Sequence, residues 1–241
     1  MKKQAYLDHF KVEKKHWWFV SKRRYIAEVL NSLKLSNTKI LDFGCGTGVT
    51  TLFLNRWGSV IGIDRSELAV ELSLKNGINA KKILTDSLPF INNSLDLITI
   101  FDVLYHKNVK PKKILQEALR VLKPGGHVLI TDCALPSLWS EHDVIMEARE
   151  RFKKTGLEVL VNNSGFKVIR SSYLFFLTFP LFYLSRKLSW LRINSGSLET
   201  NQVLSLVLKR VMQVETFIFK YLNLPIGSSL LVLAQKPYEK N

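Results

Sequence analysis

From residue 39 onward, short apolar runs rich in β-branched residues alternate with longer stretches in which apolar residues recur every three or four positions. Short runs bounded by turn residues predict strands, and the longer period predicts helices. The predicted strands lie at 40–41, 60–63, 82–84, 95–101, 127–131, 167–172 and 229–235, with helices between them, among others at 112–122 and 151–162. Strands that alternate with helices are typical of βαβ units, so the pattern predicts an α/β fold with a parallel sheet.

Helical patterns also flank this core. The first 34 residues mix apolar with basic positions and predict helix, until Ser36-Asn37 interrupts the pattern. Residues 173–224, between the last two predicted strands, form a predicted helical insertion. Its second half, 203–222, predicts an amphipathic helix. The apolar face of that helix would carry Val203, Val207, Val211, Val214 and Ile218, and the polar face Ser205, Lys209, Thr216 and Lys220.

Length and composition fit one large domain. Of the 241 residues 46% are hydrophobic, which is enough to fill a sizeable core. The net charge of +15 is unevenly spread, because residues 1–34 carry 9 basic and 3 acidic groups, residues 151–241 carry 13 and 4, and the stretch between them has 13 of each. The basic flanks indicate an anionic surface or substrate that is met there. The alternative is that the surplus lysines only keep the protein soluble.

Other features bear on where the protein resides. Two cysteines, Cys45 and Cys133, provide no disulfide framework, which favours a reducing cytoplasm, and no metal-binding cluster is visible. The N-terminus leads into charged sequence and predicts no secretory signal. The most apolar run, 173–184, is interrupted by Thr178 and Pro180 and is shorter than the roughly 20 residues that span a bilayer. We therefore predict a cytoplasmic protein that touches a membrane, if at all, at its periphery.

A glycine-rich turn follows the first predicted strand and reads Asp42-Phe43-Gly44-Cys45-Gly46-Thr47-Gly48. Glycines in such a turn let the backbone approach a ligand closely, because no Cβ atom intrudes. The dinucleotide fingerprint G-x-G-x-x-G would need its last small residue where this chain has Val49. The spacing D-x-G-x-G-x-G instead suits a ligand without a pyrophosphate.

Two acidic residues follow the next two predicted strands. Asp64 comes directly after 60–63, where a carboxylate can accept hydrogen bonds from both hydroxyls of a ribose. Asp86 lies just past 82–84, where it can accept a hydrogen bond from an adenine amino group. Each could instead cap the helix that follows it. Together with the glycine loop, the two acids favour a cofactor that contains adenosine.

On these residues the sequence resembles the class I S-adenosylmethionine-dependent methyltransferase superfamily over essentially its whole length. The resemblance is carried by segments 40–51, 60–66, 85–90, 96–106 and 115–131, the last reading LQEALRVLKPGGHVLIT. It implies a Rossmann-like seven-stranded sheet whose seventh strand runs antiparallel between strands five and six. It further implies one domain over 1–241, made of an N-terminal helical lid (1–34), a cofactor-binding core (35–172), a helical insertion between strands six and seven (173–224) and a final strand (225–241).

The resemblance also implies S-adenosyl-L-methionine as the cofactor. In that superfamily the acid at position 42 and the glycine loop surround the methionine part, the acid at position 64 binds ribose, and positions 86 and 88 frame adenine. The expected cofactor-binding residues are Asp42, Gly44, Cys45, Gly46, Gly48, Asp64, Arg65, Asp86, Ser87, Leu88 and Phe101.

Two terminal segments resemble a bacterial subgroup with small or lipid-linked acceptors: HWWFVSKRR at 16–24 and LPIGSSLLVLAQKP at 224–237. Because N-terminal helices commonly cover the cofactor pocket in this superfamily, we hypothesise that Trp18 or Phe19 covers the methyl end. Arg23 or Arg24 would then face the methionine carboxylate. The alternative is that the aromatic residues only attach the helix to the sheet.

Methyl transfer from a sulfonium is an in-line displacement, so the protein chiefly aligns the reactants and excludes water. An acceptor hydroxyl or activated carbon needs a base within hydrogen-bond reach. His106 is the first candidate, since the loop after the fourth strand borders the methyl group in such folds, and the same loop places Tyr105 beside the substrate. His142 is the second, with Asp143 to orient it. Either histidine could be an ordinary polar loop residue.

The acceptor is less closely defined by the sequence. The Asn-Pro-Pro-Tyr tetrad of nucleic-acid amino methylases is missing after strand four, which makes a nucleic-acid base a less favoured acceptor. Residues 173–190 combine aromatic residues with Arg186 and Lys187, a composition suited to an anionic membrane surface or a greasy acceptor pocket, or to a plain helical cap. We predict a methyltransferase with a small-molecule or lipid-linked acceptor. The rivals are an RNA or protein methyltransferase and an S-adenosylmethionine-binding protein without turnover, and a nicotinamide oxidoreductase ranks last.

Overall fold

A computed structural model describes residues 2–187 and 201–238. Its centre is a seven-stranded sheet with the order β3-β2-β1-β4-β5-β7-β6. The strands are β1 (Thr38–Phe43), β2 (Gly58–Asp64), β3 (Ala80–Lys82), β4 (Leu95–Phe101), β5 (Leu122–Cys133), β6 (Lys167–Leu174) and β7 (Ser229–Gln235). Neighbouring strands are parallel except that β7 runs antiparallel to both β5 and β6. The predicted α/β class and the antiparallel seventh strand are confirmed.

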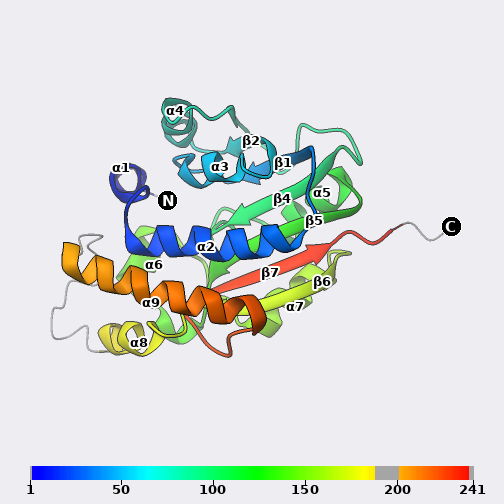
Figure 1. Cartoon of the computed structure of the whole chain (residues 1–241). Helices are drawn as coiled ribbons and strands as arrows, with labels where there is room; N and C mark the ends of the chain where they lie inside the picture. The colour runs from blue at the N-terminus through cyan, green and yellow to red at the C-terminus, as the bar shows by residue number, and fades with distance from the viewer. Residues whose placement is uncertain (1, 188–200, 239–241) are drawn as a thin grey trace.

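Helices cover both faces of this sheet (Figure 1). On one face α2 (Trp17–Ser32) and α9 (Gln202–Tyr221) pack against each other, and α5 (Pro111–Val121) and α7 (Lys154–Asn162) cover the opposite face. The remaining helices are α1 (Lys3–Val12), α3 (Val49–Leu54), α4 (Glu67–Lys75), η1 (Pro136–Leu138), α6 (Glu141–Ile145) and α8 (Phe179–Lys187).

The core is divided by the sheet into two layers. In β7 the side chains of Leu230 and Val232 join the layer under α5 and α7, whereas Leu231 and Leu233 join the layer under α2 and α9. This alternation explains why the strand reads as an unbroken apolar run, because a sheet covered on both faces buries every side chain. From α2 the second layer receives Tyr25, Ile26, Val29 and Leu30, each fully buried. Helix α2 is therefore part of the core.

The N-terminal region forms two helices, where the sequence predicts helix throughout 1–34. The chain leaves α1 after Val12 and restarts at Trp17, with an extended His16 between them. His16 caps α2, because its Nδ1 accepts a hydrogen bond from the Trp18 backbone N–H at 3.3 Å. This break turns α1 away from α2 and toward α4.

Other element boundaries also differ from the prediction. Strands β1, β2 and β5 are longer than the predicted 40–41, 60–63 and 127–131. The third strand is Ala80–Lys82, two residues earlier than predicted, because β3 pairs with β2 alone and its sequence pattern is weak. The predicted helix 151–162 begins only at Lys154, since Phe152 donates its backbone N–H to the Cys133 carbonyl. Strand β6 continues to Leu174, past the predicted end of the core at 172.

The helix predicted over 203–222 is confirmed, but the prediction of its buried face is wrong. Its buried side chains are Leu208, Met212, Glu215, Thr216 and Phe219. Val203, Val207 and Val214 are instead 68%, 53% and 57% exposed. Apolar residues lie on more than one side of α9, so their period does not define one face, and the larger side chains fill the space beside α2.

Part of the predicted insertion, residues 188–200 with Trp190, lies outside the described residues, as do 239–241 of the predicted final segment. Within the described ranges, no helix is both long enough and apolar enough to cross a membrane.

Candidate functional site

A cavity of about 610 Å³ lies at the carboxyl ends of β1, β2, β4 and β5. The order of strands reverses between β1 and β4, and in open α/β sheets the crevice at such a point is where ligands bind. Residues of α1 and α2 line the cavity from the other side. The sheet therefore supplies the floor of this site and the N-terminal helices part of its wall.

The glycine loop meets the cavity at Gly46. Its φ is +56°, and a Cβ atom there would have no atom of the described chain within 4 Å, so its backbone faces open space. Gly44 and Gly48 are needed for packing, since a Cβ atom would lie 2.3 Å from Val103 Cγ2 or 2.9 Å from Ser73 Cα, respectively. Gly48 caps α3 and is not among the lining residues. The loop thus has one glycine for close approach to a ligand and two for its own fold.

Two carboxylates are held rigidly at this end of the cavity. Asp42 accepts hydrogen bonds from the hydroxyls of Thr51 at 2.5 Å and Thr99 at 2.6 Å, and its burial raises its pKa to about 6. Asp64 accepts from the backbone N–H groups of Gly46 at 3.1 Å and Ser66 at 2.8 Å. Burial also raises the pKa of Asp64. Both line the cavity, as the sequence predicts for cofactor-binding acids.

The other predicted cofactor residues divide between the cavity and its margin. Cys45, Arg65 and Phe101 line the cavity together with Asp42, Gly44, Gly46 and Asp64. The Arg65 guanidinium forms an ion pair with Asp86, which lines a smaller neighbouring cavity.

Ser87 and Leu88 are not brought into either cavity. The Ser87 hydroxyl and the Leu88 backbone N–H donate to Glu117 Oε2 at 3.3 and 2.8 Å, and the Leu88 side chain is buried in the core.

Glu13 is a cavity residue that sequence reasoning missed. Its carboxylate accepts hydrogen bonds from Thr47 and from Thr50, the latter at 3.1 Å, so it connects the N-terminal region with the glycine loop. The side chain is buried, and burial raises its pKa. No local motif indicates Glu13, because it lies in the break between α1 and α2 and acquires its role only when α1 folds over the loop.

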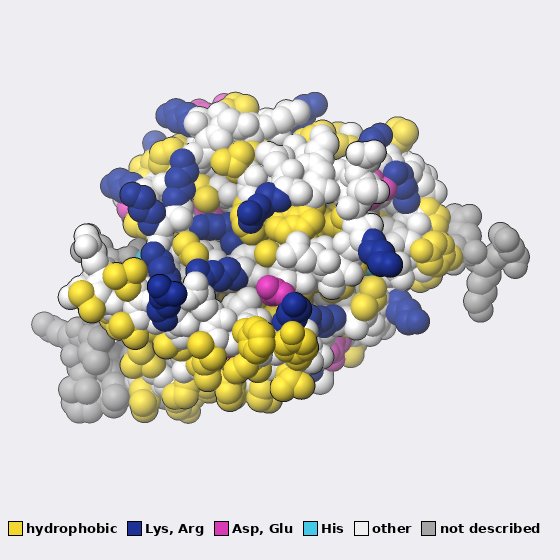
Figure 2. All heavy atoms as spheres, viewed as in Figure 1, with side chains coloured by type: hydrophobic (Ala, Val, Ile, Leu, Met, Phe, Trp, Pro, Cys, Tyr) yellow, Lys and Arg dark blue, Asp and Glu magenta, His cyan; other side chains and the backbone are white. Residues whose placement is uncertain are grey.

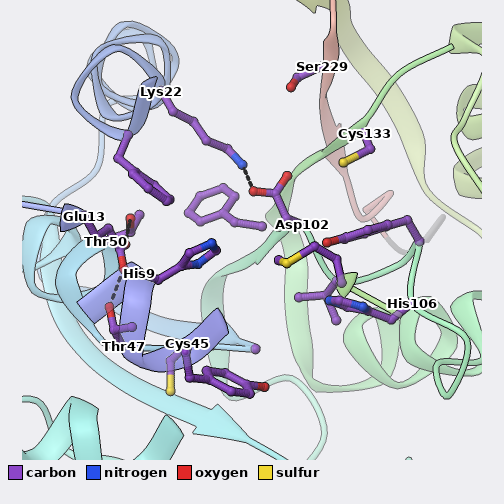
Figure 3. A pocket seen from close by; sticks show the side chains of 18 of the residues that line it. His9, Glu13, Lys22, Cys45, Thr47, Thr50, Asp102, His106, Cys133 and Ser229 are labelled. Carbon is purple, nitrogen blue, oxygen red and sulfur yellow. Dashed lines mark hydrogen bonds and ion pairs between the residues drawn. The ribbon is translucent and has the colours of Figure 1, made fainter. Parts of the chain in front are cut away.

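The cation of α2 that reaches the cavity is Lys22, where the sequence favours Arg23 or Arg24. Lys22 crosses from α2 to form an ion pair with Asp102, a residue with a φ of +55° directly after β4 (Figure 3). Arg23 donates to the backbone carbonyls of Glu13 and Lys14, and Arg24 donates to the Lys209 carbonyl of α9 at 3.1 Å. Neither arginine is among the lining residues, so the expectation that one of them faces the cofactor is not met.

Aromatic residues form the wall next to α2. Trp18 stacks on Phe175 with ring centroids 5.5 Å apart, and Phe19 meets Trp18 edge-on at 4.9 Å. Trp18 and Phe19 both line the cavity, and Trp18 also packs against the layer under α2 and α9. That either ring covers the methyl group stays a prediction. Tyr105 lines the opposite side, 2% exposed, with its ring centroid 4.2 Å from that of His106.

Four histidines line the cavity: His9, His16, His106 and His142. Figure 3 shows the His9 imidazole pointing toward the middle, between Glu13 and Thr47 on one side and Asp102 and His106 on the other. Burial lowers the pKa of His9 to about 4 and also lowers the pKa of His106 and of His142. His106 Nδ1 is buried and has no hydrogen-bond partner in the described part of the chain. A neutral imidazole with a free ring nitrogen can accept a proton.

Comparison with known proteins identifies the family. A family model described as "Methyltransferase domain" matches residues 34–168. The chain belongs to this methyltransferase family. The matched range includes β1 to β5 and the glycine loop, whereas HWWFVSKRR at 16–24 and the segment 224–237 lie outside it, so the subgroup suggested by these segments stays a prediction.

Curated relatives are similar over part of their length. The ubiquinone biosynthesis O-methyltransferase of Schizosaccharomyces pombe is 28% identical over 148 residues, which cover 52% of this chain and 53% of that protein. The demethylmenaquinone methyltransferase of Staphylococcus aureus is 40% identical over 111 residues, 42% of this chain and 45% of the relative. The chain thus spans about half the length of the curated relatives it matches.

Among solved structures, the [4+2]-cyclase SpnF has a TM-score of 0.57 and 18% identity, covering 89% of this chain and 81% of its own. That likeness shows the fold. Because the neighbour is named as a cyclase, the fold by itself does not define the reaction.

Proposed function

We propose that the protein transfers a methyl group from S-adenosyl-L-methionine to a small-molecule or lipid-linked acceptor. The observation that carries the proposal is one cavity, which joins a glycine loop with buried acids to aromatic residues and to His106, whose Nδ1 has no hydrogen-bond partner among the described residues. Such a cavity can hold a donor and an acceptor in contact while it excludes water.

The residues at the glycine-loop end fit this cofactor. S-adenosylmethionine supplies an electrophilic methyl group and carries a sulfonium and an ammonium against one carboxylate. Glu13, Asp42 and Asp64 offer an excess of negative charge to that net cation, and Asp64 has the position at the end of β2 that suits a ribose. The open space at Gly46 accommodates the methionine part, and Lys22 can face its carboxylate.

His106 is proposed as the group that takes the proton from the acceptor. It follows β4, beside the buried Tyr105, and lies across the cavity from Glu13 and Thr47 (Figure 3). Its lowered pKa keeps the imidazole neutral at pH 7, which is the form that a general base requires. His142 lines the same cavity and is the second candidate.

Thermal unfolding tests whether S-adenosyl-L-methionine is the methyl donor. The protein is unfolded with S-adenosylhomocysteine, which is the demethylated cofactor, and separately with NAD. A ligand at about 100 times its Kd stabilises the native state by about 2.7 kcal/mol. We expect S-adenosylhomocysteine to raise Tm by several degrees and NAD to leave it unchanged. A rise with NAD and none with S-adenosylhomocysteine would show that the cofactor is wrong.

The acceptor class is proposed from the relatives and from the surface. Both curated relatives are named for quinones, which favours an acceptor of that kind. Figure 2 shows apolar side chains gathered along α9 with lysine and arginine side chains beside them. The exposed apolar residues of this helix include Val203, Leu204, Leu206, Val207, Val214, Phe217 and Tyr221, and Leu222 follows directly after it. An exposed apolar strip on a basic protein suits the surface of an anionic membrane, where a lipid-linked acceptor resides.

Vesicle flotation tests the membrane part of the proposal. We expect the protein to float with vesicles that contain phosphatidylglycerol and less with pure phosphatidylcholine. The double variant Val207→Ser, Phe217→Ser should lose flotation. Leu84→Ser, Ile91→Ser is the matched control, since these side chains are 81% and 79% exposed and lie far from α9 in sequence. Equal flotation of the two double variants would contradict a role of α9 in membrane contact.

The rival functions are separated by one labelling experiment. Purified protein is incubated with methyl-labelled cofactor and fractionated cell extract, and label is counted in lipid, nucleic-acid, protein and small-molecule pools. We expect label in the lipid or small-molecule pool. Label in RNA or protein would favour those acceptors. Cofactor binding with no label in any pool would favour a binding protein.

A further inference from the structure

We infer that the acceptor carries a carboxylate or phosphate group, and that Arg186 together with Arg151 binds this anion inside the cavity. The inference rests on the proposed function and specifies the substrate of the same site. Arg186 comes from α8 in the insertion, and Arg151 from the segment that lies beside the end of β5. Both line the cavity.

Arg151 is held in place through its Nε and Nη1, and its Nη2 makes no hydrogen bond to a described residue. Its side chain is 3% exposed, its Nε donates to Asp143 Oδ1 at 2.8 Å, and its Nη1 donates to the Ala134 carbonyl at 3.0 Å. Asp143 is 1% exposed, and its other oxygen, Oδ2, accepts from the backbone N–H and the hydroxyl of Ser140 at 2.9 and 3.2 Å. Both oxygens of the Asp143 carboxylate therefore already accept hydrogen bonds from residues other than Arg186.

Arg186 is buried without an adequate partner. Its side chain is 5% exposed, yet its Nη1 is 3.6 Å from Asp143 Oδ2, beyond hydrogen-bond distance, and has no hydrogen bond to any described residue. One face of its guanidinium is covered by the Phe182 ring, 5.0 Å away. Leaving a guanidinium buried and incompletely paired costs several kcal/mol, so a ligand that supplies the missing acceptor gains that energy on binding.

Two guanidinium groups facing one carboxylate give this end of the cavity an excess of positive charge. This positive charge also acts on neighbouring groups. The pKa of His142 is lowered chiefly by burial and next by the charge of Arg186, and the pKa of Arg186 is lowered chiefly by burial and next by the charge of Arg151. Asp102 also lines the cavity, but it is paired with Lys22. A planar guanidinium matches the two oxygens of a carboxylate or phosphate better than a point charge does.

The charges of the cavity are segregated, which assigns the anion to the acceptor and not to the cofactor. Glu13, Asp42 and Asp64 lie around the glycine loop, and the two arginines come from segments that follow β5. The cofactor carboxylate has Lys22 as a closer candidate partner, on the helix that adjoins the loop. An acceptor that enters from the insertion side would meet Arg186 and the aromatic wall together, so it would combine an apolar body with an acidic group.

The test measures binding of three naphthalene probes by calorimetry, with the enzyme saturated with S-adenosylhomocysteine. The probes are 2-naphthoate, 2-naphthyl phosphate and the neutral 2-naphthamide. We expect one charged probe to bind at least about tenfold more tightly than the amide, and the identity of that probe distinguishes carboxylate from phosphate. Arg186→Gln should reduce its affinity to that of the amide and leave the amide affinity unchanged. Arg186→Lys should retain part of the preference for the charged probe, since lysine keeps the positive charge but lacks the planar guanidinium that donates two parallel hydrogen bonds.

Arg210→Gln is the matched control, because it removes the same charge from the exposed surface of α9, outside the cavity lining. Equal binding of charged and neutral probes to the wild-type protein, or no binding of either charged probe, would overturn the inference. The inference would also be overturned if Arg186→Gln and Arg210→Gln lost the same affinity for the charged probe. Equal losses would indicate that the net charge of the whole protein attracts the probe. A loss of S-adenosylhomocysteine affinity in folded Arg186→Gln would assign the arginine to the cofactor instead.

Failure of the wild-type protein to bind S-adenosylhomocysteine would overturn the proposed function itself. Binding of S-adenosylhomocysteine without preference for a charged probe would overturn only the inference about the acceptor. If Arg186→Gln does not fold, as its thermal unfolding would show, Arg186→Lys and the wild-type preference decide the question.

Discussion

Asp64 connects the glycine loop with the end of the next strand, β2. Two backbone N–H groups, of Gly46 and Ser66, orient its carboxylate at the end of β2. The position was predictable from sequence, because a carboxylate directly after an apolar strand is a local pattern. Its rigidity was not, since the hydrogen bond from Gly46 joins two separate βα turns.

We predict that Asp64→Asn weakens S-adenosylhomocysteine binding about tenfold or more. The asparagine amide has one acceptor oxygen where the carboxylate has two, and the substitution also removes the negative charge. Isothermal titration measures the affinity. The matched control is Asp96→Asn, because Asp96 also accepts a hydrogen bond from a backbone N–H, and in addition from Lys123, but near the amino end of β4, outside the cavity lining. An unchanged affinity in Asp64→Asn would remove the residue from cofactor binding.

His106 carries a prediction about rate and pH. If it accepts the acceptor proton, His106→Asn lowers kcat by about 10²- to 10⁴-fold and leaves the KM for the cofactor nearly unchanged. In the wild-type enzyme kcat should rise with pH through the lowered pKa of His106 and be level by pH 7, because only the neutral imidazole is a base. Steady-state kinetics on the labelled acceptor pool measure the loss of kcat and its pH dependence. His142→Asn is measured in parallel as the comparison variant. Full turnover in His106→Asn would exclude this role.

At the scale of elements, α9 is attached to α2 and to the end of β6 by the buried Glu215. The carboxylate is 0% exposed and accepts from the Tyr25 hydroxyl and from the backbone N–H groups of Phe176 and Leu177, the latter two at 2.7 and 2.8 Å. Burial raises the pKa of Tyr25, so the phenol stays protonated and can donate. A glutamate in the buried face of a helix contradicts the simple hydrophobic pattern, which is why sequence reasoning missed it.

We predict that Glu215→Ala lowers the free energy of unfolding by about 3 kcal/mol or more, because three buried donors lose their acceptor. Tyr25→Phe removes one of those hydrogen bonds and should cost about 1 kcal/mol. Denaturant unfolding measures both. A Glu215→Ala protein as stable as the wild type would show that α9 is held by apolar packing alone.

At the scale of the whole molecule, all five histidines lie where burial lowers their pKa. A histidine whose folded pKa lies below its unfolded value binds more protons when unfolded, so the stability it permits at neutral pH is lost as pH falls. Buried acids such as Asp42, with a raised pKa, act in the opposite direction. The pH dependence of stability is the sum of these contributions. The difference between a variant and the wild-type protein gives the contribution of the one group that was replaced.

We predict that His9→Asn reduces the acid sensitivity of the protein. The folded pKa of His9 is about 4 against an ordinary 6.5, so between pH 6.5 and 4 protonation of the unfolded state costs the wild type about 3 kcal/mol of stability. The difference in unfolding free energy between variant and wild type should therefore shift by about that amount, in favour of the variant, from pH 7 to 4. A constant difference across this range would contradict the burial of His9.

The sequence by itself determined the α/β class, the seven strands and the glycine loop with its downstream acids, because strand alternation and βα turns are local patterns. Only the tertiary structure decided which face of α9 is buried, that Lys22 and not Arg24 reaches the cavity, and that Glu13 joins the loop. The physical reason is distance along the chain. Arg24 is held by a carbonyl 185 residues away, and Arg186 of the insertion lies beside Asp143 of α6, which precedes β6. Such partners are chosen by packing, which no local period describes.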